Sequence, residues 1–234
     1  MTGLQSRLKE PELMDDPSLD AAAHAQALRG LARINRWSAS SRIVWSPLLE
    51  WMRRHGRRSA RVLDVATGAG DMPLALWRRA TRAGMDLRIE GCDTSAQAVA
   101  HAQANARKAG ADVRFFVVNA VTGVPAGYDV VMCSLFLHHL EEDEAVRVMR
   151  DMGRAAGGLV LVNDLARSRR GLALAYAGTR LLSRSPVVHA DGPRSVRAAF
   201  TPQEARRLAE QAGWTGAIVE RKWPCRFLIA WHAS

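Results

Sequence analysis

Residues 61–71 read Arg61-Val62-Leu63-Asp64-Val65-Ala66-Thr67-Gly68-Ala69-Gly70-Asp71. The apolar residues at the start of this stretch predict a buried strand. Gly68 and Gly70 predict a tight turn, because glycine adopts backbone angles that a side chain disfavours. Pro73 then favours the first turn of a helix. A strand, a glycine turn and a helix in this order form a place where α/β proteins bind nucleotides.

An acidic residue follows at the distance expected for a nucleoside ligand. Segment 87–92 predicts a second strand, and Asp93 stands at its end, 23 residues after Gly70. A carboxylate in this position can accept hydrogen bonds from ribose hydroxyls. Pro73 replaces the third glycine of the dinucleotide pattern, and Asp71 would repel a pyrophosphate. These residues therefore favour an adenine nucleoside ligand that carries no phosphates.

The glycine turn carries a specific resemblance. The run Asp64-Val65-Ala66-Thr67-Gly68-Ala69-Gly70-Asp71 resembles motif I of the class I S-adenosylmethionine (SAM) methyltransferases, in the D-x-A-x-G-x-G-D form of the ubiquinone and menaquinone group. Ala66 stands where the first glycine is usual, a departure shared with that group. The resemblance covers residues 58–234 and implies SAM as the cofactor. It also implies the methylation of small molecules, as in phenolic and polyketide tailoring.

Predicted strands and helices alternate along residues 58–234. This alternation predicts an α/β fold with a doubly wound, mostly parallel sheet of seven strands, Rossmann-like in architecture. Strands are expected at 61–66, 87–92, 112–118, 128–133, 159–163, 216–221 and 226–231. Helices are expected at 71–83, 95–109 and 141–155, and from the capping box at 201–204 to Gly213. The resemblance implies that the closing hairpin makes the last strand antiparallel.

Two segments lie outside this alternation. Residues 1–57 are interpreted as an N-terminal helical cap: a loose arm over 1–15, a helix that begins at Asp16-Pro17, and a second helix from Ser46-Pro47 to His55. Residues 165–200 are interpreted as a substrate-lid insert, with a helix over 171–182 and a loop over 185–193. The insert holds seven arginines and one acidic residue. Its place after the fifth strand puts it above the carboxyl edge of the sheet.

The resemblance implies how the methionine part of SAM is held. The backbone at Ala66, Gly68 and Gly70 would pack against it, and Asp64 or Asp71 would hold its amino group. The rest of the cofactor would contact residues further along the chain.

Asp93 would take the ribose hydroxyls, Thr94 would adjoin the adenine, and the amide oxygen of Asn119 would accept a bond from the adenine amino group. An alternative is that Asn119 only forms a turn. The other positions assigned to the cofactor site are Thr67, Ala120 and Ser134.

Methyl transfer to a hydroxyl needs a positioned nucleophile and a base that removes its proton. His138 and His139 follow the fourth strand, where the methyl group should point, and histidine has a pKa near neutrality. Either is a candidate base, and lining the pocket is the equal alternative. His189, with Asp191 in the insert, is a second candidate, and Asp164 could accept a proton or orient the substrate.

The amino-acid composition bears on which partners, compartment and metals are expected. The net charge is +10, which is compatible with a nucleic-acid surface, but only three basic residues are lysines, which favours an arginine-rich genome as the cause. The basic, apolar helix of the insert could also lie on a membrane surface. Three cysteines, the absence of a signal-peptide pattern and the absence of a long apolar run predict a cytoplasmic protein without a transmembrane segment. No zinc-type spacing is visible, so no metal is expected.

The sequence therefore predicts a SAM-dependent methyltransferase for a small, largely apolar acceptor, most simply a hydroxyl of a phenolic, quinone or polyketide-type metabolite. Methylation at carbon of an electron-rich ring stays open. An RNA methyltransferase is a further alternative, although the sequence contains no Asn/Asp-Pro-Pro-Tyr/Phe motif of base methylation. The sequence gives no indication of the oligomeric state.

Overall fold

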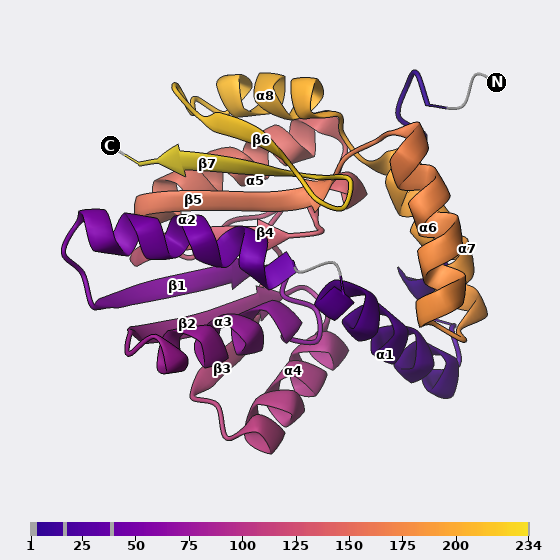
Figure 1. Ribbon diagram of the computed structural model, residues 1–234, viewed down its shortest axis with the longest axis horizontal. Coiled ribbons are helices and arrows are strands. Elements are labelled where there is room, and N and C mark those ends of the chain that lie inside the picture. Colours follow the sequence, from indigo (N-terminus) through magenta and orange to yellow (C-terminus); the bar gives the residue numbers. More distant parts are fainter. Residues whose placement is uncertain (1–3, 16–17, 38–39, 234) are drawn as a thin grey trace.

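The computed structural model describes residues 4–15, 18–37 and 40–233, and a single sheet of seven strands forms its centre (Figure 1). The strands are β1 (Ser59–Val65), β2 (Asp86–Asp93), β3 (Val113–Val117), β4 (Tyr128–Ser134), β5 (Ala156–Leu165), β6 (Ile218–Lys222) and β7 (Arg226–His232). Their spatial order is β3-β2-β1-β4-β5-β7-β6. Strands β1 to β5 pair in parallel, whereas β7 is antiparallel to both β5 and β6. The predicted α/β fold with a mostly parallel sheet of seven strands is confirmed.

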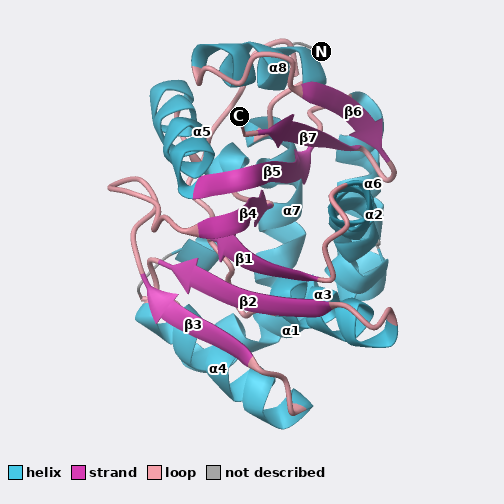
Figure 2. Cartoon of the chain, turned by 90° about the vertical axis from the view of Figure 1, so that its left-hand side faces the viewer, coloured by secondary structure: helices cyan, strands magenta, loops and turns pink. Residues whose placement is uncertain are grey.

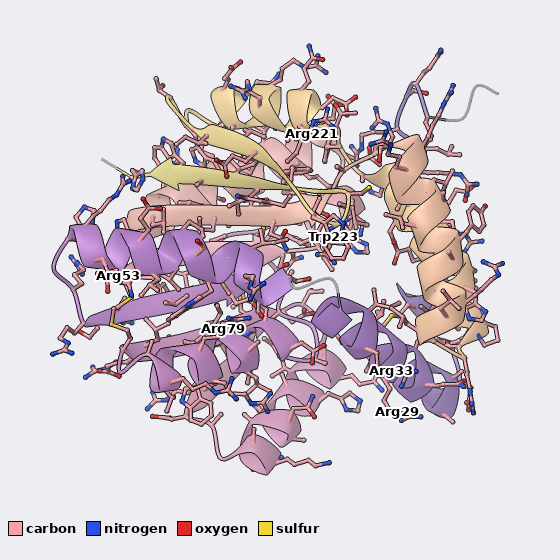
Figure 3. All side chains as sticks on the ribbon, in the orientation of Figure 1. Arg29, Arg33, Arg53, Arg79, Arg221 and Trp223 are labelled. Atoms are coloured by element: carbon pink, nitrogen blue, oxygen red, sulfur yellow. The ribbon has the colours of Figure 1, made fainter. Side chains whose placement is uncertain are left out.

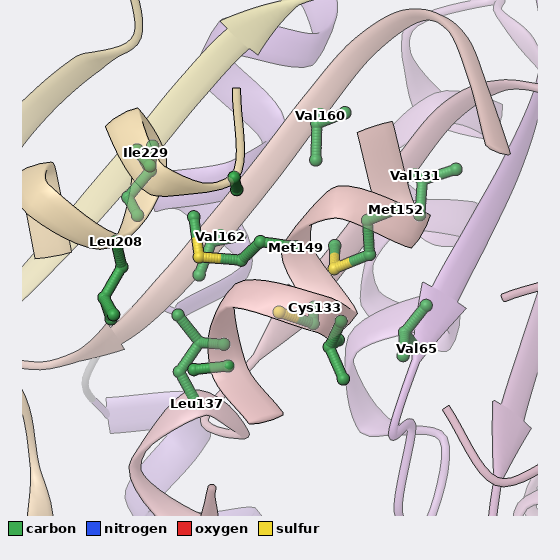
Figure 4. Packing of buried hydrophobic residues seen from close by; sticks show 14 of the residues in the cluster. Val65, Val131, Cys133, Leu137, Met149, Met152, Val160, Val162, Leu208 and Ile229 are labelled. Atoms are coloured by element: carbon green, nitrogen blue, oxygen red, sulfur yellow. The ribbon is translucent and has the colours of Figure 1, made fainter. Parts of the chain in front are cut away.

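Helices cover both faces of the sheet because each central strand has apolar side chains on both sides (Figure 2). Along β1, Val62 packs into the core under α2 (Ser40–Arg54), α3 (Asp71–Arg82) and α4 (Ala96–Ala109). Its neighbours Leu63 and Val65 face α5 (Glu142–Ala155) and α8 (Pro202–Gln211). Figure 4 shows this second core, in which Met149 and Met152 of α5 pack over Val65, Val131 and Cys133.

A third group of helices lies beyond the carboxyl ends of the parallel strands: α1 (Ala21–Trp37), α6 (Arg169–Leu182) and α7 (Pro186–Ala198), which contact one another (Figure 1). Small residues bring these helices together. A Cβ atom at Gly192 would lie 2.5 Å from Cγ2 of Thr179, and one at Gly30 would lie 2.3 Å from Oγ of Ser183. The loop predicted over 185–193 is wrong, because this segment begins helix α7. Pro186 stands in its first turn, where a missing N–H costs nothing.

The starts of the first two helices also differ from the prediction. Asp16-Pro17, the predicted start, lies outside the described residues, and α1 begins at Ala21, where a carboxylate oxygen of Asp20 accepts the N–H groups of Ala22 and Ala23, each at 3.0 Å. Helix α2 begins at Ser40, six residues before the predicted Ser46, and Pro47 lies inside it.

The loose arm predicted over residues 1–15 is also wrong for the part that the structure describes. Residues 4–15, which we call the N-terminal strap, run along α7 and include the short 3-10 helix η1 (Leu13–Asp15). Arg7 donates to the carbonyl oxygen of Leu140 at 2.8 Å, and its guanidinium lies 3.7 Å from the ring centre of Phe200. The Asp191 carboxylate accepts the backbone N–H groups of Leu13 and Met14. The strap has no hydrophobic period, so its sequence alone does not reveal this anchoring.

Candidate active site

The glycine turn between β1 and α3 is fixed by backbone geometry and by one carboxylate. Gly68 and Gly70 have φ angles of 55° and 79°, and Ala66, with φ 56°, also adopts the left-handed conformation. The Gly68 N–H donates to Oδ2 of Asp93 at 2.8 Å, while Oδ1 of Asp93 accepts the Ser95 N–H at 3.0 Å. A side chain at Gly70 would collide with the ring of Phe115, 2.8 Å from its Cβ position. The turn therefore exposes backbone in a fixed shape at the carboxyl end of β1.

Asp64 lies beneath this turn, and only one of its two carboxylate oxygens is hydrogen-bonded to a described residue. Its Oδ2 accepts the Thr67 hydroxyl at 2.7 Å, whereas its Oδ1 is buried without a hydrogen-bond partner among the described residues. Burial raises the pKa of Asp64 to about 7, against the opposing effect of the Thr67 hydrogen bond. Burial also raises the pKa of Asp71. An unsatisfied carboxylate oxygen in a pocket is suited to a cationic ammonium group, which would also favour its ionised form.

One pocket of about 720 Å³ joins the turn to the third group of helices. Its floor is the carboxyl edge of the sheet, and its walls include α1, α6, α7 and the strap. Apolar side chains dominate the part under the helices, where Leu28, Leu31, Ile34, Leu174 and Val196 line it. A volume of this size accommodates a nucleoside-sized ligand together with a second small molecule. Of the predicted site residues, the pocket is lined by Asp64, Ala66, Thr67, Gly68, Asp71, Ser134, His138 and His139.

His138 and Asp164 form a buried pair at the wall of the pocket. Nδ1 of His138 lies 2.7 Å from Oδ1 of Asp164, and the backbone N–H of His138 donates to Oδ2 of the same carboxylate at 3.2 Å. This contact assigns the proton to Nδ1 in the neutral ring and leaves the lone pair on Nε2. Burial lowers the pKa of His138, but the charge and hydrogen bond of Asp164 outweigh it, so the net pKa lies above the usual value. The same pairing lowers the pKa of Asp164 despite its burial.

His139 has a different electrostatic environment from its neighbour. Its ring centre lies 4.2 Å from that of His138. Burial and the repulsion from His138 lower the pKa of His139 to about 4, so its ring is neutral at pH 7. His138 is therefore the stronger base of the two.

The strap adds Glu12 to this site, a residue that the sequence analysis did not single out. Its Oε1 lies 3.9 Å from Nε2 of His138 and accepts the Ser195 hydroxyl of α7 at 2.5 Å. Glu12, His138 and His139 also bring three possible metal-ligand atoms within 4.8 Å of one another. Sequence spacing does not indicate such a group, because Glu12 is far from the histidines along the chain.

Arg226, at the start of β7, is a second residue that sequence reasoning missed. It is buried, lines the pocket and pairs in register with Leu165 of β5, next to Asp164. Burial lowers its pKa to about 10, and the charge of Asp164 opposes this shift. Only the pairing of β7 with β5 brings this arginine to the site, and that pairing is not visible in a linear sequence.

Several predicted residues lie beside the pocket or away from it. Asp93 holds the glycine turn, as described above, and Thr94 is exposed next to it. The Asn119 side-chain oxygen accepts the Val121 N–H at 3.0 Å, which is the turn role named as its alternative, and Ala120 is buried in the core. His189 is not brought into the pocket: its Nε2 contacts the carbonyl oxygen of Ser183 at 2.9 Å, and its neighbour Asp191 anchors the strap.

Comparisons with known proteins agree with this geometry. Residues 62–157 match a family model described as a methyltransferase domain. A ubiquinone biosynthesis O-methyltransferase from Paraburkholderia phytofirmans is 26% identical over 140 residues, which are 58% of this chain and 58% of that protein. The chain thus corresponds to little more than half the length of this curated relative.

Solved structures show the same fold. The SAM-dependent methyltransferase SibL has a TM-score of 0.67 at 20% identity, over 96% of this chain and 63% of that one. Magnesium protoporphyrin IX methyltransferase from Synechocystis, with S-adenosylhomocysteine bound, has a TM-score of 0.58 at 15% identity, over 94% of this chain and 90% of that one.

Residues 62–157 thus match a methyltransferase domain in sequence, and the sheet order and glycine turn give the chain the fold of the solved SAM-dependent methyltransferases. S-adenosylmethionine, the cofactor that the sequence predicts, carries an activated methyl group on a sulfonium. The free oxygen of Asp64 in the pocket fits the cationic amino group of this cofactor.

We expect SAM binding to release protons near neutral pH. Burial raises the pKa of Asp64 to about 7, and a cationic group beside its carboxylate would lower that pKa and expel the proton. Calorimetric titration in two buffers of different ionisation enthalpy measures the release. Asp64→Asn should abolish most of it, whereas loss of the release in Asp71→Asn instead would assign the amino group to Asp71, the alternative partner. Tight SAM binding with no buffer dependence would contradict this assignment.

Proposed function

We propose that the protein transfers the methyl group of SAM to a hydroxyl of a small, largely apolar acceptor of phenolic, quinone or polyketide type. The observation that carries the proposal is the His138–Asp164 pair in the wall of the pocket that also contains the glycine turn. The apolar lining under α1, α6 and α7 supports an acceptor with few charges.

Four polar residues of the site take part in the proposed mechanism: His138, Asp164, Glu12 and Ser195. Asp164 holds the imidazole of His138 with Nδ1 protonated, so Nε2 faces the pocket and takes the proton of the acceptor hydroxyl. The resulting imidazolium is stabilised by the Asp164 carboxylate, which is buried and retains its charge. Glu12, whose carboxylate lies near Nε2 of His138 and accepts the Ser195 hydroxyl, helps to orient the hydroxyl of the acceptor.

A panel of phenols, hydroxyquinones and hydroxypyrones, incubated with SAM and the protein, tests the proposal. Mass spectrometry should detect a methylated product together with S-adenosylhomocysteine, and NMR of the product separates an O-methyl from a C-methyl group. A parallel reaction with EDTA tests whether a metal at Glu12, His138 and His139 takes part. Methylation only at carbon would overturn the assignment of a hydroxyl acceptor.

The pH dependence of kcat should report His138. The neutral ring is the base, so kcat rises with pH through a midpoint above the usual histidine value, because Asp164 raises the pKa of His138. Asp164→Asn removes that carboxylate and leaves burial, which lowers the pKa, so the midpoint should move to lower pH while kcat falls. A pH–rate series of both proteins measures this shift, and an unchanged midpoint would exclude His138 as the titrating group. SAM affinity, measured on each, shows whether the variant keeps its fold.

A further inference from the structure

Helix α6 presents apolar side chains to solvent. Its outward stripe is spaced as one helix face and consists of Arg170, Leu174, Ala177 and Leu181, all exposed. Leu181 is 83% exposed and Leu174 is 50% exposed. Isolated exposed leucines are ordinary, but two of them on one helix face among arginines form an amphipathic surface whose apolar side points away from the protein.

The charged side chains of α1 and α6 are all basic. Neither α1 nor α6 contains an acidic residue in its sequence, and α1 carries Arg29 and Arg33 on exposed positions. The two helices are joined, since Nε of Arg33 donates to the carbonyl oxygen of Leu182 at 2.7 Å. Arg169, Arg170 and Arg180 add three exposed arginines from α6. The surface therefore attracts anions.

The tip of the hairpin between β6 and β7 belongs to the same side of the molecule. Trp223, at this tip, is 72% exposed, and Figure 3 shows it on the same face as Arg29, Arg33, Arg53 and Arg79. A surface hollow of about 560 Å³ between α2 and α3 is lined by four arginines, including Arg53 and Arg79. Its acidic residue, Glu50, is paired with Arg54. An exposed tryptophan on a face that also carries arginines is typical of a membrane-interface contact.

This surface borders the pocket. Leu174 both lines the pocket and is half exposed, so it connects the interior to the outer stripe of α6. Pro224 and Cys225, next to Trp223, also line the pocket. Apolar residues of α6 and of the hairpin tip therefore border the pocket, and Arg42, Arg78 and Arg79 line it as well.

We propose that the face formed by α1, α6 and the β6–β7 hairpin tip docks on an anionic lipid bilayer, so that the apolar acceptor enters the pocket from the membrane. We call this surface the docking face. The identity of the entering molecule rests on the proposed function, but the docking itself does not. Arginines bind the lipid phosphates, and Leu181 and Trp223 enter the interfacial region.

A bilayer fits this face better than a nucleic acid does. Base recognition on single strands uses several aromatic rings as stacking platforms. The docking face instead offers exposed leucines, which gain free energy in a lipid interface and nothing from a phosphate backbone. Its positive charge suits both partners, so the experiment must separate them.

Co-sedimentation with vesicles tests the proposal. The full chain is mixed with vesicles of phosphatidylglycerol and phosphatidylcholine, or of phosphatidylcholine alone, at low and high salt. The double variant Arg29→Glu/Arg170→Glu reverses two exposed charges of the docking face, and Leu181→Ser removes its most exposed leucine. The matched control is Arg206→Glu/Arg207→Glu, the same change of charge on exposed positions of α8, at another edge of the sheet.

We expect binding to the anionic vesicles, little binding to the neutral ones, and a loss of at least about tenfold for Arg29→Glu/Arg170→Glu, since each surface arginine contributes about fivefold. The α8 control should lose much less, and Leu181→Ser should weaken the binding that persists at high salt. No vesicle binding, equal losses in both double variants, or preferential binding of an RNA oligonucleotide would overturn the proposal.

Calorimetric SAM binding by every variant shows that the cofactor site is intact. Docking can thus fail while methyl transfer to the acceptor panel persists, and vesicle binding without any methylation would reject only the proposed function.

Discussion

His138→Asn is expected to lower kcat by about 10²–10⁴, the range that general base catalysis contributes. The asparagine amide nitrogen takes the position of Nδ1 and keeps a donor facing Asp164, so the buried carboxylate is not left without a partner. What the variant lacks is Nε2, the atom that faces the pocket. Steady-state kinetics with an accepted substrate measures kcat, and calorimetry should give an unchanged affinity for SAM.

Variants at two other histidines, His139 and His189, are controls for this result. His139→Asn should retain most of the activity, because its ring has a pKa of about 4 and is a weak base. His189→Asn should retain it as well, because that ring contacts the backbone of Ser183 away from the pocket. A kcat within about tenfold of the parent for His138→Asn would exclude base catalysis by His138. A larger loss in His139→Asn would transfer the role to His139.

The second large effect concerns the cofactor. Asp93→Ala should weaken SAM binding on the order of 100-fold or more, because the carboxylate orders the glycine turn through the Gly68 N–H and is expected to accept the ribose hydroxyls. Two charge-assisted hydrogen bonds are worth about 3 kcal/mol or more together. Calorimetric titration measures the dissociation constant.

Asp112→Ala is the control for this experiment, since it removes an exposed carboxylate just before β3. The SAM affinity of Asp93→Asn should lie between those of Asp93→Ala and Asp112→Ala. The amide oxygen of asparagine can still accept the Gly68 N–H, but it carries no charge. An unchanged SAM affinity in Asp93→Ala would show that the cofactor lies elsewhere along the sheet edge.

The sheet could be predicted from the sequence because its signals are local. Each strand has a short apolar run, and the helices α4, α5 and α8 begin or end at caps that are readable in sequence, such as the capping box of Thr201 and Glu204. The glycine turn is equally local, since backbone angles at Gly68 and Gly70 restrict which residues can occupy them. Local signals therefore predicted the fold and the position of the pocket floor.

The acceptor side of the pocket could not be predicted in the same way. The strap has no hydrophobic period, and it is held by single contacts to residues far along the chain, such as Leu8 N–H to the carbonyl of Arg197 at 3.1 Å. Glu12 and Arg226 enter the site only through such long-range packing. Helix α7 was missed because Gly192 and Pro193 within it are typical of a turn, whereas close packing against Thr179 favours a helix here.

The strap has a consequence for the order in which the site forms during synthesis. Its partners around residues 197–200 emerge from the ribosome long after the strap itself, and Arg226 emerges later still. A nascent chain that ends after β5 already contains the glycine turn, His138 and Asp164, but it lacks the contacts that carry Glu12 to the histidine. Cofactor recognition can therefore mature before the acceptor side of the pocket closes, and the closing step joins segments that lie far apart along the chain.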